Sequence, residues 1–168
     1  MENAKLDAAF DCVFTLADTG EGLSSLSDLA ADCHGEDADR LAACIRSAGL
    51  VEGVLVTSLA EDASEATVCA ALSLLGNLLT DEYDVDAHQS LDLFESAGGL
   101  DALIALIHSH GYPINGIYSH RHLFALAALR NLTSLDPHGS CCEKLRGLGA
   151  DELLTELIQS GENGDDPI

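Results

Sequence analysis

Apolar positions recur at helical spacing along this chain and are interrupted by short corners that contain glycine. Residues 90–136 show the pattern most clearly, as S-L-D-L-F-E-S-A-G-G-L-D-A-L-I-A-L-I, a polar loop and H-L-F-A-L-A-A-L-R-N-L-T-S-L-D. The spacing predicts a short helix that ends at Gly98-Gly99, a second helix over 100–108 and a longer third helix over about 119–134. Further amphipathic helices are predicted over 5–18 and 22–33.

This three-helix pattern repeats along the sequence. The corner Arg46–Gly49 aligns with Glu95–Gly98, 49 residues later, and that corner aligns with Arg146–Gly149, 51 residues later. Each corner precedes an apolar helix, namely V-E-G-V-L-V-T-S-L, L-D-A-L-I-A-L-I and A-D-E-L-L-T-E-L-I. The third helix recurs too, because Ala71–Asp81 aligns with Ala125–Leu135 at an offset of 54. Self-similarity of this kind predicts a helical repeat protein.

The repeat period of about 50 residues exceeds the ~40–47 residues of HEAT and armadillo units. Two long loops, Thr80–Gln89 and Ser109–Tyr118, account for the excess. Because each repeat contacts only its neighbours, we expect these loops to lie on the outside of the array.

The second helix G-G-L-x-x-L-I-x-L-I and the third helix A-L-R-N-L-T resemble the armadillo repeats of catenins and importin-alpha. HEAT repeats share the Leu and Ala spacing, but the corner glycines and the late Asn favour armadillo. The resemblance covers about residues 37–160, two full units and the start of a third. It implies an all-α fold, a right-handed α-α superhelix of about three repeats. Residues 1–36 would be a degenerate repeat or cap, since Ala9, Thr15 and Leu16 align with Ala71, Asn77 and Leu78. Residues 161–168, G-E-N-G-D-D-P-I, are polar and are predicted to be a disordered tail.

In armadillo proteins the third helices line a concave groove, and an Asn at this position binds the backbone of an extended peptide. An Asn side chain offers both a donor and an acceptor to a peptide unit. The resemblance therefore implies a peptide-binding groove made of two stripes: Ala66, Ala70, Ser73 and Asn77, and His120, Phe124, Ala127 and Asn131. Importin-alpha has a Trp one turn before the Asn, where this chain has Ser73 and Ala127, which argues against a nuclear-localisation receptor. Alternatively, each Asn only ties down its own helix end or the next loop.

Composition and charge narrow the function classes. Apolar residues make up 47 % of the chain and aromatic residues 4 %, as expected for closely packed Leu- and Ala-rich helices. The net charge of −22 disfavours binding to nucleic acid and to anionic membrane surfaces. It indicates either a basic protein partner or a solubilising surface. No apolar run approaches the ~20 residues that span a bilayer, and the N-terminal residues do not have the pattern of a signal peptide.

Three groups of residues suggest chemistry, each with a simpler alternative. His108, His110, His120 and His122 flank one loop and form a candidate Zn²⁺ or Ni²⁺ site, or else solvated and capping side chains. Asp81, Glu82, Asp84 and Asp86 are a candidate Ca²⁺ loop without the EF-hand pattern, or a plain acidic loop that attracts a basic partner. Cys141-Cys142 open a helix, where thiols become reactive, or else pack in the core.

These observations predict a non-catalytic protein-binding scaffold or adaptor that needs no cofactor. It would bind an extended, possibly basic, peptide segment in the groove or act as a subunit of a larger assembly. The alternatives are a metal-binding or His-dependent enzyme that uses the 108–122 loop, and an adaptor that responds to pH through its histidines. Six cysteines without CxxC spacing favour a reduced, intracellular protein, cytoplasmic or in an organelle after removal of a presequence.

Overall fold

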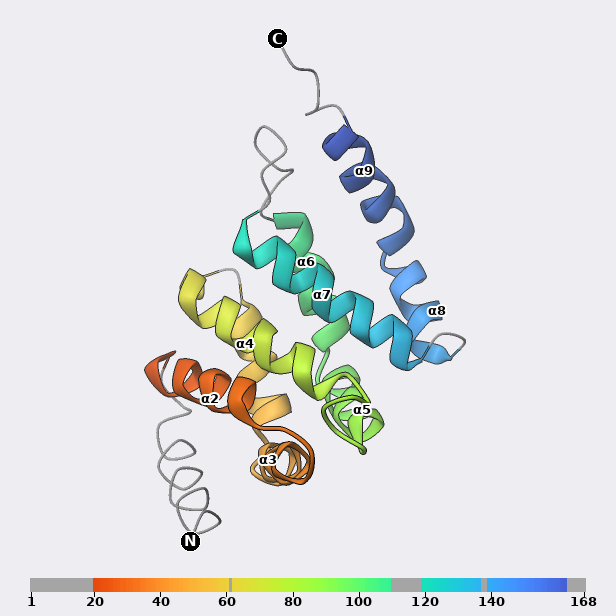
Figure 1. Cartoon of the computed structure of the whole chain (residues 1–168). Helices are drawn as coiled ribbons and strands as arrows, with labels where there is room; N and C mark the ends of the chain where they lie inside the picture. Colours follow the sequence, from red (N-terminus) through yellow and green to blue (C-terminus); the bar gives the residue numbers. More distant parts are fainter. Residues whose placement is uncertain (1–19, 61, 110–118, 137–138, 163–168) are drawn as a thin grey trace, which may run out of the picture.

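The computed structural model describes residues 20–60, 62–109, 119–136 and 139–162 (Figure 1). All regular structure in these residues is helical, which confirms the all-α prediction. The elements are α2 (Gly20–Asp32), α3 (Glu36–Ser47), a π-helical turn η1 (Val51–Leu55), a 3-10 turn η2 (Thr57–Leu59), α4 (Glu65–Leu78), α5 (Ala87–Ser96), α6 (Gly99–Ser109), α7 (His120–Leu135), α8 (Ser140–Gly147) and α9 (Ala150–Glu162).

The repetition seen in the sequence is present in the backbone at the three corners. Gly49, Gly98 and Gly149 all have positive φ angles, of 68°, 80° and 82°. In each corner the glycine N–H donates to the carbonyl oxygen three residues before it, at 3.0 Å, and the glycine carbonyl accepts from the N–H four residues after it. Residues with a Cβ rarely adopt a positive φ angle. Glycine adopts it readily, so one helix can end and the next can begin directly after it.

The longer helices of successive units lie side by side. α2 packs against α4, and α4 packs against α7. Figure 1 shows these three helices as neighbours in one layer, with α3 and α5 seen nearly end-on below it. We call α3, η1, η2 and α4 the first unit, and α5, α6 and α7 the second unit; α8 and α9 follow them.

The third helices of the two units begin with the same N-cap. The hydroxyl of Ser64 accepts a hydrogen bond from the backbone N–H of Thr67 at 3.2 Å, and that of Ser119 accepts from the N–H of His122 at 3.4 Å. A serine hydroxyl at this place satisfies a backbone donor that has no partner within the helix.

Two segments differ from the sequence prediction. Residues 51–59, predicted as one apolar helix, form the π-helical turn η1 and the 3-10 turn η2 instead. Gly53 and the β-branched valines of this segment are weak helix formers, which explains why the regular hydrogen-bond pattern is lost. The helix that lies on α4 is α2, whereas the segment aligned with the third helices, residues 5–18, lies outside the described residues. α9 continues through Glu162, two residues into the predicted tail, and the rest of that tail also lies outside them.

A buried ion pair joins the two units. The guanidinium of Arg46, at the end of α3, contacts the carboxylate of Asp84 in the loop before α5, and their side chains are only 8 % and 1 % exposed. Arg46 Nη1 also donates to the hydroxyl of Ser90 at 3.0 Å, and the backbone N–H of Asp86 donates to Asp84 Oδ1 at 3.0 Å. Asp84 is therefore a structural residue, and the prediction of a plain acidic loop or a Ca²⁺ loop is wrong for it.

The core is built mainly from Leu and Ala, as the composition predicts. Phe94 is its largest fully buried side chain. Its ring fills the space beside Gly99, where an added Cβ would lie 2.4 Å from two ring carbons. The corner between α5 and α6 therefore needs glycine for packing as well as for backbone geometry.

Among the described residues, no single helix is long and apolar enough to cross a membrane. The bent pair Glu36–Ser47 and Val51–Leu59, whose two parts meet at 71°, reaches the required length and composition only when both parts are taken together.

Candidate functional site

The predicted stripe on α7 is open to solvent over most of its length. His120, Phe124 and Ala127 are exposed, with 38 % of Phe124 accessible, and Asn131 is half-buried. These residues are spaced by three and four positions, so they occupy one face of the helix. This half of the predicted groove is therefore available for contact with a partner.

The predicted stripe on α4 is less accessible. Ala66 is exposed, Ser73 and Asn77 are half-buried, and Ala70 is buried with 8 % of its surface accessible. Ala70 was predicted to line an open groove, and that prediction is wrong. The reason is that α4 lies between α2 and α7, so two neighbouring helices cover its sides.

The side-chain amide of Asn131 forms a hydrogen bond that links the two units. Its Nδ2 donates a hydrogen bond to the backbone carbonyl of Gly76 in α4 at 2.8 Å. This fits the alternative that the asparagine is structural, although the bond reaches the preceding third helix and not the next loop. The side-chain oxygen Oδ1 of Asn131 accepts no hydrogen bond from the described residues, so it keeps its acceptor capacity.

We expect Asn131→Ala to lower the free energy of unfolding by about 1 kcal/mol more than Asn77→Ala does, because only Asn131 loses a hydrogen bond between helices. Asn77 is the matched control, since both substitutions change helix propensity equally and its side chain makes no hydrogen bond with the described residues. Denaturation in urea would measure both. Equal losses would mean that the bond to Gly76 contributes nothing.

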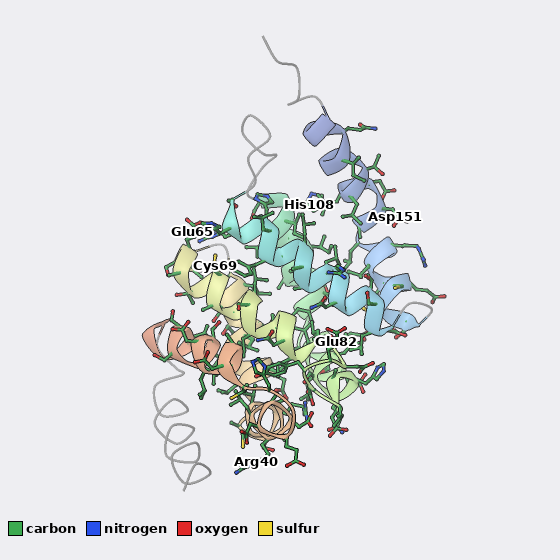
Figure 2. The ribbon with its side chains drawn as sticks, in the orientation of Figure 1. Arg40, Glu65, Cys69, Glu82, His108 and Asp151 are labelled. Carbon is green, nitrogen blue, oxygen red and sulfur yellow. The ribbon has the colours of Figure 1, made fainter. Side chains whose placement is uncertain are left out.

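An open cleft of about 440 Å³ lies where α4 and α7 end, next to Asn131. We call it the α4–α7 cleft, and its lining is mostly polar: Leu79, Thr80, Asp81, Glu82, Arg130, Asn131, Ser134 and Leu135. Figure 2 shows Glu82 close to the end of α4. The sequence had identified Asn131 as a site residue and Asp81 and Glu82 as a charged loop, but it did not indicate that they share one cleft.

Arg130 and Ser134 were missed as site residues. Both lie on α7, one residue before and three residues after Asn131, and both are exposed. Helical spacing from Asn131 offered a signal for Ser134, because positions three apart share a face. Arg130 brings a guanidinium into a cleft that also holds two carboxylates, so the cleft offers groups of both charges to a ligand.

The predicted four-histidine site is not assembled from the described residues. His108 and His120 are exposed, His110 lies outside the described residues, and His122 is buried with its Nδ1 2.8 Å from the hydroxyl of Ser119. No group of three or more His, Cys, Asp or Glu side chains in the described ranges is arranged to hold a metal ion. The prediction that His122 is a metal ligand or a solvated side chain is wrong, because His122 lies on the inner face of α7 and is buried.

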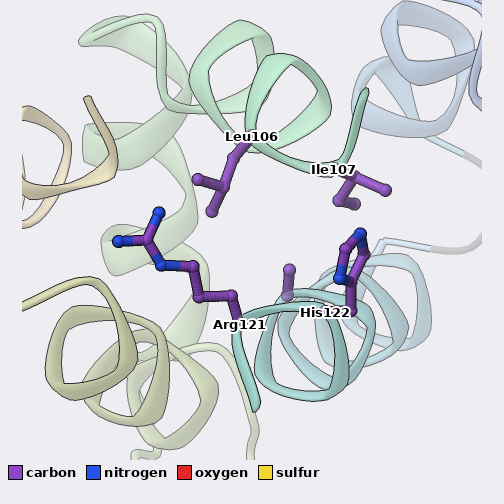
Figure 3. A pocket seen from close by; sticks show the side chains of 5 residues that line it. Leu106, Ile107, Arg121 and His122 are labelled. Carbon is purple, nitrogen blue, oxygen red and sulfur yellow. The ribbon is translucent and has the colours of Figure 1, made fainter. Parts of the chain in front are cut away.

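The pocket beside His122 is too small to bind a ligand. It is lined by Leu106, Ile107, Arg121, His122 and Ala125 and has no room for a water molecule. Figure 3 shows the His122 ring directed toward Ile107, while the Arg121 side chain points the other way. The Arg121 guanidinium donates to the backbone carbonyl of Ala63 at 2.9 Å, so this arginine ties the start of α7 to the start of the first unit's third helix.

Cys141 is a core residue and not a reactive thiol. It is fully buried at the start of α8, and burial together with the nearby Glu95, Cys142 and Asp136 raises its pKa to about 12. A thiol with so high a pKa is almost entirely protonated at neutral pH and is a poor nucleophile. The core-packing alternative is confirmed for Cys141.

Comparisons with known proteins leave the site to be interpreted from its own geometry. No protein-family model matches the chain. No curated protein and no solved structure gives a significant match to it either.

Proposed function

We propose that this chain is a non-catalytic protein-binding module of armadillo type, which holds an extended segment of a partner protein along α7 and in the α4–α7 cleft. The observation that carries the proposal is the cleft itself, an open volume of about 440 Å³ beside the Asn131 amide. A right-handed superhelix of units related to the armadillo repeat is the arrangement we propose for the whole array, on the basis of the three matching corners.

The polar groups of the cleft suit a peptide. The side-chain Oδ1 of Asn131 can accept a hydrogen bond from a peptide N–H, while its Nδ2 donates to the Gly76 carbonyl and this bond fixes the orientation of the side chain. Asp81 and Glu82 offer carboxylates to a Lys or Arg side chain. With a net charge of −22 on the chain, long-range attraction would also favour a basic segment.

The open face of α7 extends the contact beyond the cleft. Phe124 and His120 lie on the same face as Asn131, two and three turns toward the start of the helix, and both are exposed. An exposed aromatic ring is a common anchor for a bound side chain. An extended segment that follows α7 would therefore contact an aromatic side chain at one end and two carboxylates at the other.

A display library of 12-residue peptides, followed by calorimetry on the selected peptides, would test this proposal. We expect the selected peptides to be rich in Lys and Arg. Ser134→Arg, which places a bulky cation in the cleft, should raise their dissociation constants at least about tenfold, equivalent to ~1.4 kcal/mol. Phe124→Ala should also weaken binding, since it removes the aromatic contact.

Ala105→Arg is the matched control, because it adds the same side chain to an exposed helical position on α6. It should leave binding unchanged. Selected peptides that bind the Ser134→Arg protein as tightly as the unmodified one would exclude the cleft as the binding site.

A further inference from the structure

A second surface lies on the side of α7 that faces away from α4. We call it the α7–α9 groove. It has a volume of about 250 Å³ and is lined by Leu129, Thr133, Cys142, Leu145, Arg146, Ala150, Asp151 and Leu154, which come from α7, α8 and α9. Ile158 on α9 is an exposed apolar side chain, 62 % accessible. It lies one turn beyond Leu154, on the face of α9 that lines the groove.

The repeat indicates what kind of element fits this groove. The corresponding face of α4 carries Leu72, Gly76 and Leu79, and it is covered by α7, whose Asn131 bonds to Gly76. Leu72 and Leu79 are 1 % and 0 % exposed. At an offset of 54, the same face of α7 carries Leu126, Arg130 and Thr133, which are only half-buried or exposed. No helix within the described ranges covers α7 in the way that α7 covers α4.

The groove is therefore shaped for one more helix of the third-helix type, packed against α7 and resting on α8 and α9. Among the segments of this chain outside the described residues, residues 5–18 (L-D-A-A-F-D-C-V-F-T-L-A-D with its flanking Lys5) have the required pattern. They are predicted to form an amphipathic helix with Leu6, Ala9, Val13 and Leu16 on one face. This segment also aligns with the third helices through Thr15 and Leu16, at the positions of Asn77 and Leu78.

Charge is complementary between this segment and the groove. Four of the seven Lys and Arg residues of the chain lie within residues 121–146, namely Arg121, Arg130, Lys144 and Arg146. Arg130 is exposed and has no ion-pair partner among the described residues, whereas Arg146 lies 3.8 Å from Asp151 and Lys144 pairs with Glu95. The polar face of residues 5–18 carries Asp7, Asp11 and Asp18. Arg146 lines the groove and Arg130 lies at its edge, next to Leu129, so an acidic helix in the groove would meet positive charge in a chain whose net charge is −22.

We propose that the α7–α9 groove binds the N-terminal segment, residues 5–18, of a second copy of this chain. Within one molecule the segment is joined to α2, and α4 separates α2 from α7 (Figure 1), so the groove lies at the other end of the helical layer. A second copy brings its segment to the groove without this restriction. The contact joins two different surfaces, so it is head-to-tail and leaves a further groove and a further segment open at the ends. No residue lines both this groove and the α4–α7 cleft, although Arg130 of the cleft lies at the edge of the groove, and the contact does not depend on peptide binding in the cleft.

Sedimentation velocity on the full chain, over a series of concentrations, would test the proposal with two double variants. Arg146→Glu/Ile158→Glu alters exposed positions at the groove, so it preserves the fold, and Val13→Glu/Leu16→Glu alters the apolar face of the segment. We expect the unmodified chain to associate as its concentration rises and each double variant to remain a monomer. Mixed in equal amounts, the two variants should form a dimer and nothing larger, because one supplies an intact segment and the other an intact groove.

Val85→Glu is the matched control, since it places a glutamate at another exposed apolar position, in the loop before α5, and should leave association unchanged. Ser134→Arg should leave it unchanged too, which separates this contact from the α4–α7 cleft. The proposal would be overturned by an unmodified chain that stays monomeric at every concentration. Association that survives in the segment variant, or a mixture of the two variants that remains monomeric, would overturn it equally.

Discussion

Replacing Arg46 by methionine should lower the free energy of unfolding by about 3–5 kcal/mol, the range for removing one partner of a buried ion pair. The methionine keeps much of the side-chain volume but removes the charge. Asp84, whose side chain is 1 % exposed, would then be a buried carboxylate that has lost its counter-ion. The loss should appear as a shift of the urea midpoint to lower concentration with little change in slope.

Arg40→Met is the matched control for this experiment. Arg40 lies on the same helix as Arg46 and pairs with Asp37 at 3.7 Å, but the two side chains are 43 % and 50 % exposed. An exposed pair of this kind contributes about 0–1 kcal/mol, so the control should lose far less stability. If the two arginine variants were equally stable, the buried pair would not be what holds the two units together.

The double variant Arg46→Met/Asp84→Asn gives a second check on the same ion pair. It removes both charges, so no buried charge is left without a partner. We expect it to be more stable than Arg46→Met alone, because the cost of the single variant comes from an uncompensated charge. A double variant that loses as much as the two single variants together would show that the residues act independently.

Phe94→Ala should lower the free energy of unfolding by a similar amount, about 3–5 kcal/mol, because it removes a fully buried aromatic ring and leaves a cavity. The cavity would open beside Gly99, at the corner between α5 and α6, where the ring is packed closely against the backbone. Thermal or urea denaturation followed by circular dichroism would measure the loss.

Phe124→Ala is the matched control, since Phe124 is also a helical phenylalanine but is 38 % exposed on α7. It should lose less than about 1 kcal/mol, because a surface substitution leaves no cavity. This variant weakens peptide binding in our proposal and leaves the core intact, so binding and stability can be separated. A Phe124→Ala protein as unstable as Phe94→Ala would mean that Phe124 belongs to the core.

The features that the sequence determined by itself are local ones. Apolar spacing predicted the helices of both units and their order, apart from residues 51–59, and glycine predicted the three corners at Gly49, Gly98 and Gly149. Ser64 and Ser119 are the N-caps of the third helices, a local feature that was not predicted. Each of these features depends on residues within about one helical turn of each other, so it can be predicted without knowing what packs on it. The armadillo superhelix concerns how the units stack, and it remains a proposal.

Other features were decided only by the tertiary structure, because they join residues far apart in the chain. In the sequence Asp84 is one of several acidic residues in a loop. Its role follows from its contact with Arg46, 38 positions away. The sequence predicts that Asn131 binds a peptide backbone. In the structure α7 packs on α4, and the Asn131 amide donates to the Gly76 carbonyl, 55 positions away. Ala70 and His122 have ordinary helical positions in the sequence but are buried. The faces that neighbouring helices cover are set by how the helices stack, and one chain's periodicity does not contain that information.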